Sequence, residues 1–209
     1  MSAPWHHVRV LFPCSLRIPT SRWAVDAWTG PGWKQLSRHQ TLAAAPPQIA
    51  LAALTGLRVR ELPAVRALFA LRRLKYTPDQ TLLEFFSTSP FTKLDEIPGK
   101  EIVGGILLPG RSADGVRRQP ATPEEFRTAL ESAPVAAIAT VRVDPVKGGS
   151  RLATETFVRT RGALAGALFS AYWLPIAPFS SWIRRMFLDA ARVRAEARAP
   201  TIRQWVFPR

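Results

Sequence analysis

The sequence is poor in the residues from which disulfides and metal sites are built. Its 209 residues include one cysteine, Cys14, and three histidines. A single cysteine excludes an internal disulfide and any metal site made of several cysteines. His6 and His7 are adjacent near the N-terminus, so His39 is the one histidine in the part expected to fold. Because a zinc site needs at least three good ligands, we predict no bound metal.

The motifs of the common enzyme classes are also missing. The sequence has no GxSxG, no phosphate-binding loop and no dinucleotide fingerprint, since its Gly-Gly pairs lack the required spacing. No nucleotide cofactor is therefore expected. Glu155, in a predicted strand, is the one carboxylate that we nominate as a general acid or base. The simpler interpretation is that Glu155 pairs with Arg159, which lies four residues further on and on the same side of the strand.

Acidic residues are scarce compared with basic ones. The chain has 15 acidic and 29 basic residues, a net charge of +14, and nearly all the basic residues are arginine. Such a charge favours phosphate-rich partners, but the arginines are spread along the chain, so nucleic-acid binding is not favoured. The low cysteine content fits a reducing compartment, and we expect a cytoplasmic protein.

The length and the apolar content indicate a single domain with extensions. Residues 1–35 show no sustained helical or strand period, and they hold four of the seven tryptophans. We interpret them as an irregular N-terminal arm that packs on the domain or trails from it. The domain itself is expected to span residues 36–198, and a short C-terminal tail occupies residues 199–209.

Apolar spacing and turn signals predict an α+β order of elements in this domain. The expected elements are a strand at 38–43, a helix at 48–54, a hairpin of strands at 90–97 and 100–108, a helix at 123–131 and strands at 135–143 and 152–160. The Gly104-Gly105 pair inside an apolar strand indicates a bulge or the close approach of another segment. Thr122 and Glu125 have the spacing of a helix capping box.

A long helix is predicted at 162–197. Between Arg161 and Arg184 it carries 22 uncharged residues, and about 20 apolar residues are enough to cross a bilayer. Pro175 and Pro178 count against a spanning helix, because two prolines three residues apart disrupt its backbone hydrogen bonds. From Arg184 onward, charges recur with a helical period. We therefore favour an amphipathic helix of the domain, with a membrane-associated helix as the alternative.

Several segments together resemble a known family. The run LATETFVRT is followed by Phe169, Tyr172-Trp173, Pro178 with Ser180, Ile183-Arg184-Arg185 and Ala195-Glu196, and it is preceded by RHQTLAAAPP, ELPAVRALFALR, LLEFFSTSPFTKLDEIPGKEIVGGI and PEEFRTAL. This pattern resembles an uncharacterised bacterial family of START-like proteins in the SRPBCC superfamily. The resemblance implies a helix-grip fold, in which a strongly curved antiparallel sheet wraps around a long C-terminal helix and leaves an apolar cavity.

Members of that superfamily bind lipids, sterols, polyketides or plant hormones, and some are cyclases or hydrolases, so the fold alone does not choose a function. We predict that a small apolar ligand, a lipid or polyketide, binds between sheet and helix. The predicted contact residues are Ala137, Ala139, Val141, Thr154 and Thr156 on the strands and Leu164, Leu168 and Tyr172 on the helix. The alternatives are that these residues meet in a filled core, or that the protein is an enzyme like a polyketide cyclase or dehydratase. The sequence does not indicate an oligomeric state.

Overall fold

The structure is a computed structural model, and it describes residues 23–71, 77, 79–81, 84, 91–108 and 119–199. The start of the predicted arm, with His6, His7 and Cys14, lies outside the described residues, as does the predicted tail from residue 200. The elements, in chain order, are η1 (Ala24–Ala27), β1 (Lys34–Ala43), α1 (Pro47–Thr55), η2 (Val59–Glu61), α2 (Pro63–Leu71), β2 (Thr92–Ile97), β3 (Glu101–Leu108), α4 (Pro123–Leu130), β4 (Val135–Val146), β5 (Gly149–Thr160) and α5 (Ala163–Arg198).

One antiparallel sheet holds the described strands together. Its five strands lie in the order β1-β5-β4-β3-β2, and every neighbouring pair is antiparallel. Directly paired residues share a face of the sheet. Thr154 pairs with Val141, and Thr156 pairs with Ala139; we call their side of the sheet the inner face. Glu155 projects from the opposite side, which we call the outer face.

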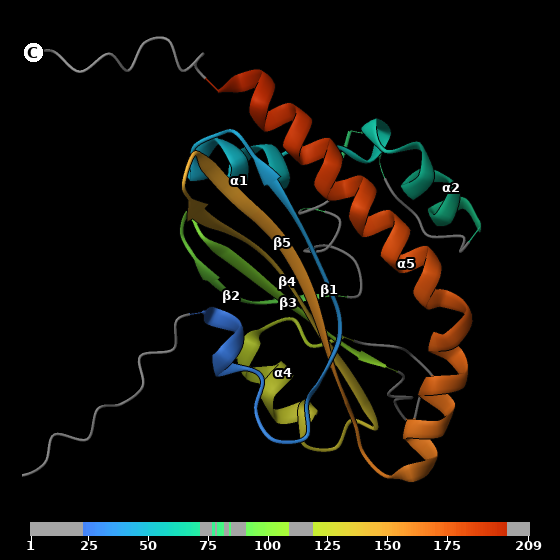
Figure 1. Cartoon of the computed structure of the whole chain (residues 1–209). Helices are drawn as coiled ribbons and strands as arrows, with labels where there is room; N and C mark the ends of the chain where they lie inside the picture. Colours follow the sequence, from blue (N-terminus) through green and yellow to red (C-terminus); the bar gives the residue numbers. More distant parts are fainter. Residues whose placement is uncertain are drawn as a thin grey trace, which may run out of the picture.

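Helices α1 and α5 cover the inner face (Figure 1). The second half of α5 runs along the sheet and meets α1 at one end of the strands. The apolar core there consists of buried residues from α1, α5, β1, β4 and β5, including Ala50, Leu54, Val143, Leu152, Leu188 and Ala191. A smaller cluster of Val59, Leu62 and Val65 packs under the middle of α5. This end of the inner face is therefore fully packed.

The outer face has a cover of its own, made by η1 and α4. Trp28 and Phe126 meet edge to face, with ring centroids 6.1 Å apart, and both are buried together with Val25, Val103 and Ile138. Residues 24–28 belong to the stretch that the sequence assigned to an irregular arm. In the structure this part of the arm is packed on the sheet, where it shields apolar strand residues from water.

The predicted fold class is confirmed. A curved antiparallel sheet and a long C-terminal helix form the helix-grip arrangement of an α+β fold (Figure 1). The long helix, the helix after Thr122 and the hairpin around Gly99 lie where they were predicted. β1 begins earlier than predicted, at Lys34, because it pairs with β5 along its whole length. As an edge strand it alternates exposed polar residues with covered ones, so its apolar pattern is weak.

Of the two alternatives for the Gly104-Gly105 pair, a bulge or a close approach, the structure shows the close approach. The pairing of β2 with β3 does shift register, but the extra residue is on β2, between Lys93 and Asp95, which pair with Gly104 and Val103. A Cβ atom on Gly105 would lie 2.6 Å from the ring of Phe126 and 2.7 Å from Leu94. Gly105 is therefore needed for the close packing of α4 on the outer face, since no such distance is tolerated between carbon atoms.

Gly105→Ala is expected to lower the free energy of unfolding by about 1–3 kcal/mol, because the added methyl group overpacks this contact. Gly104→Ala is the control, because its Cβ would meet only the Thr92 carbonyl oxygen at 3.8 Å. Thermal unfolding followed by circular dichroism measures both. Equal melting temperatures for the two variants would contradict this packing.

Candidate ligand-binding site

Arg184 is the polar group of α5 that points at the inner face. Its Nη1 donates a hydrogen bond to Thr154 Oγ1 at 3.1 Å, and its Nε donates one to Ser180 Oγ at 3.4 Å. Burial lowers the pKa of Arg184 to about 10, so the guanidinium is still charged at neutral pH. Among the described carboxylates, none lies within ion-pair distance of it. Within the described part of the chain, Arg184 is thus a partly buried cation whose hydrogen bonds go to two hydroxyl groups.

Three further polar groups lie near Arg184 on the inner face. His39 pairs with Thr154 across β1 and β5, and Ser37 pairs with Thr156 one step further along. The buried atoms Ser37 Oγ, His39 Nε2 and Thr156 Oγ1 have no hydrogen-bond partner among the described residues. Buried polar groups are nearly always hydrogen-bonded, so three unpaired ones on neighbouring residues mark this part of the sheet.

The charge of His39 is set by its surroundings. Burial lowers the pKa of His39 below its usual 6.5, and the positive charges of Arg184 and Arg185 lower it further. His39 is therefore neutral at pH 7, with one ring nitrogen able to donate and the other able to accept a hydrogen bond.

The strand half of the predicted site is brought together on the inner face. Ala137, Ala139 and Val141 follow one another on β4, and Thr154 and Thr156 lie beside them on β5. The two threonines are buried. The three β4 residues are only partly buried, although β4 is the central strand. The inner face is therefore less tightly covered here than at its packed end.

The helix half of the predicted site lies elsewhere. Leu164, Leu168 and Tyr172 are 73%, 63% and 48% exposed, so they are on the side of α5 that faces away from the sheet. Their four-residue spacing does define one stripe, as predicted. However, this half of α5 is apolar on both sides, and spacing alone does not tell which side turns inward.

The inward side of α5 follows from the position of Arg184. Trp173 precedes it by about three helical turns and so lies on the same side. The rings of Phe169 and Trp173 stack, with centroids 6.0 Å apart, and both side chains are partly buried. Arg184 itself was not predicted to be a site residue. The sequence did hold one sign of its position: Arg184 lies four residues after Ser180 and three before Phe187, so the three share one side of the helix.

Glu155 is on the outer face, away from this cluster. It is 3% exposed, and its carboxylate binds Arg142 at 2.9 Å and Arg38 at 3.1 Å. The structure therefore gives Glu155 two arginine partners, and neither is the predicted Arg159. The predicted partner comes from the same strand, whereas the observed ones come from the neighbouring strands β4 and β1.

A second buried carboxylate, Glu101, lies close to this ion pair. Its two oxygens accept hydrogen bonds from Thr140 Oγ1 and from the backbone N–H of Ala24, each at 2.6 Å. Burial raises the pKa of Glu101, although these hydrogen bonds favour its charged form. The Arg142 guanidinium also lies over the ring of Trp23, 4.8 Å from its centroid. These contacts fasten η1 and the residue before it to the outer face.

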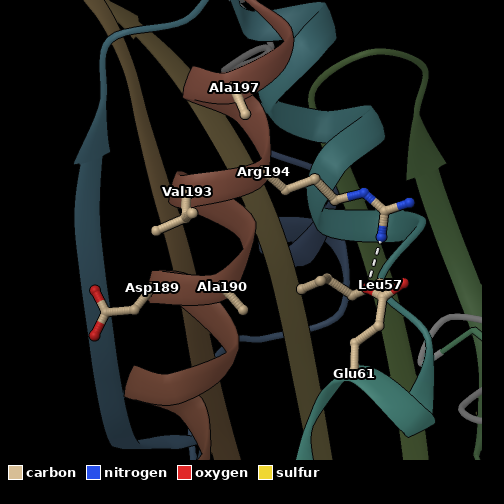
Figure 2. A pocket seen from close by; sticks show the side chains of 7 residues that line it. All are labelled: Leu57, Glu61, Asp189, Ala190, Val193, Arg194 and Ala197. Carbon is tan, nitrogen blue, oxygen red and sulfur yellow. Dashed lines mark hydrogen bonds and ion pairs between the residues drawn. The ribbon is translucent and has the colours of Figure 1, made fainter.

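A shallow hollow lies between the C-terminal part of α5 and the segment that follows α1 (Figure 2). Its lining residues are Leu57, Glu61, Asp189, Ala190, Val193, Arg194 and Ala197. Arg194 crosses it and donates hydrogen bonds to Glu61 at 2.8 Å and to the Gly56 carbonyl at 3.0 Å. Because its arginine is already paired, this hollow is a weaker candidate than the cluster around Arg184. In the described part of the chain, no group of three or more metal-ligating side chains occurs.

Comparison with known proteins adds likeness of structure only. No family model matches the sequence, and no curated protein matches it. An uncharacterized protein from Rhizobium leguminosarum is 16% identical over 79% of this chain and 97% of its own, with a TM-score of 0.28. Ara h 8.0201 is 11% identical over 76% of this chain and 99% of its own, with a TM-score of 0.26. Neither likeness supports an argument about function, and membership of the START-like family stays a prediction.

Glu155→Gln is expected to lower the free energy of unfolding by about 3 kcal/mol, because it removes the nearer carboxylate of the buried Arg142 and leaves it only Asp144, at 4.0 Å, among the described residues. Glu96→Gln is the matched control, since Glu96 forms an exposed ion pair with Lys93 that contributes less than about 1 kcal/mol. Urea unfolding measures the difference. If both variants were equally stable, the ion pair of Glu155 would not be part of what holds the sheet together.

His39 is expected to titrate below pH 6.5 in the folded protein. Between its folded and unfolded pKa values the unfolded chain binds more protons, so stability falls as the pH drops below 6.5 and is kept above it. Nuclear magnetic resonance of the imidazole measures the pKa, with His39→Gln to assign the signal. Arg184→Met should raise this pKa by removing a positive neighbour. A His39 pKa of 6.5 or higher in the wild type would contradict the described surroundings.

Proposed function

We propose that the protein binds a small amphipathic molecule whose anionic group is held at Arg184 and whose apolar part lies between the inner face and α5. The observation that carries this proposal is the guanidinium of Arg184, partly buried, charged and without a carboxylate partner among the described residues. Removing a charge from water costs free energy unless an opposite charge or several hydrogen bonds compensate it.

A carboxylate or a phosphate group would supply the negative charge that Arg184 lacks among the described residues. Arginine presents a planar fork of donors that matches two oxygens of such a group. Ser37, His39 and Thr156, on the strands next to it, supply polar atoms that no other described residue binds. Neutral His39 and the hydroxyl groups can donate hydrogen bonds to the oxygens of an anion without adding negative charge.

The surroundings of the cluster suit an apolar chain or ring system. Ala137, Ala139 and Val141 offer small apolar side chains on the central strand, and Phe169 and Trp173 offer aromatic ones on the inward side of α5. A mostly apolar lining with a few polar groups is the usual form of a small-molecule site. The apolar ligand implied by the START-like resemblance agrees with this lining, and Arg184 adds an anionic group to it.

The alternative of an enzyme like a polyketide cyclase or dehydratase depended on Glu155. That carboxylate is bound to two arginines on the outer face, so it is not directed at a ligand under α5. Binding is therefore the function that the described residues support best.

Arg184→Met is expected to weaken binding of a dansyl-labelled fatty acid by about ten- to a hundred-fold, the range for losing hydrogen bonds to a charged group. Arg185→Met is the matched control, because Arg185 is the next residue on α5 and is exposed. Fluorescence titration measures both variants. The methyl ester of the same probe should bind the wild type weakly and should not respond to Arg184→Met.

Two results would contradict the proposal. One is equal affinity of the wild type for the acid and its ester, because the anionic group would then have no cation to bind. The other is an equal effect of Arg184→Met and Arg185→Met, because net charge rather than this site would then determine binding.

A further inference from the structure

The side of α5 that faces away from the sheet carries a continuous row of large apolar residues. We call this row the α5 stripe; its members are Leu164, Leu168, Tyr172, Phe179 and Trp182, all exposed. Their spacings of three, four and seven residues place them on one side of a helix. Single exposed apolar residues are ordinary, but a contiguous row of them marks an interaction surface.

The stripe is long and its helix is held in place from behind. From Leu164 to Trp182 it extends over about 27 Å. No residue in the most apolar stretch of α5 is buried, and the helix is long and apolar enough to cross a membrane. Its opposite side, however, is bound to the sheet through Arg184 and Thr154 and through buried Leu188. A helix fixed to a folded domain on one side can lie on a membrane surface, with only its free side in the lipid.

The charges around the stripe identify the kind of surface that it fits. The sequence has no acidic residue between Glu155 and Asp189. Arg161 and Arg185 flank the stripe, both are exposed, and neither has an ion-pair partner in the described part of the chain. With a net charge of +14, a second copy of the chain is repelled, whereas an anionic surface is attracted.

We propose that the α5 stripe docks the protein on an anionic membrane surface. Its leucines and Phe179 enter the apolar edge of the lipid layer. Tyr172 and Trp182 have the amphipathic rings that favour the membrane–water interface. Arg161 and Arg185 contact the lipid phosphates. This surface goes beyond the proposed ligand site, because it uses the outward side of α5 and not the inward one.

Flotation of the full chain with lipid vesicles tests this surface. Wild-type protein is expected to float with vesicles of phosphatidylcholine and phosphatidylserine, and much less with phosphatidylcholine alone. Leu168→Glu should weaken this partition about ten-fold or more, since it removes a leucine from the lipid and adds a negative charge. Leu42→Glu is the matched control and should leave it unchanged. Leu42 is 60% exposed and Leu168 is 63% exposed, but Leu42 lies on β1, on the outer side of the sheet.

The outcomes separate this proposal from its competitors. Absence of flotation with anionic vesicles, or equal loss in the two variants, would overturn it. Resistance of the bound protein to alkaline extraction would overturn it as well, because it would indicate a spanning helix. A change in oligomeric state caused by Leu168→Glu without vesicles would make a second copy the occupant. Without vesicles, Leu168→Glu should bind the dansyl-labelled fatty acid like the wild type, so failure of the ligand site and failure of the membrane surface are distinguishable.

Discussion

The register between β4 and β5 decides what each face of this protein can do. A tight turn at Lys147 and Gly148, with Gly148 at a positive φ of 83°, joins the two strands. Because side chains alternate along a strand, a shift of one residue would move every one of them to the other face. The observed register places Thr154 and Thr156 under α5 and sends Glu155 to the outer face. The ligand site and the structural ion pair are separated by this choice.

This separation explains why the two arginines Arg142 and Arg184, one on each face of the sheet, have different roles. On the outer face, Glu155 binds both Arg142 and Arg38, and Glu101 is held by hydrogen bonds. Such a network fixes the packing of neighbouring elements and leaves little free for a ligand. On the inner face, Arg184 meets hydroxyl groups and a neutral histidine, but no described carboxylate. Among these groups, the guanidinium of Arg184 on the inner face is therefore the one available to bind an anion.

Helix α5 faces the sheet on one side and solvent on the other. Its inward side carries Trp173 and Arg184, and its outward side carries Leu168 and Trp182. The second half of the helix is anchored in the core by Leu188, so the first half can keep an apolar side in contact with solvent. We infer that one helix links the two proposed surfaces, a ligand site beneath it and a lipid surface above it.

The sequence predicted what depends on short-range patterns. The strands 135–143 and 152–160, the turn at Gly99 and the α+β order follow from alternation and turn residues, and the structure confirms them. The strand half of the site followed from the same alternation. The sequence did not show which side of α5 faces the sheet. The first half of this helix is apolar on both sides, so residue spacing does not distinguish them. The partners of Glu155 were also beyond reach, because they come from other strands and depend on the pairing of the sheet.

Intermolecular nuclear Overhauser effects between methyl-labelled protein and a bound fatty acid test the proposed site most directly. The account predicts contacts from the acyl chain to the methyl groups of Ala137, Ala139 and Val141, with no contacts to Leu164 or Leu168. Contacts to Leu164 and Leu168 without any to Ala139 would contradict it, because the ligand would then lie on the outward side of α5.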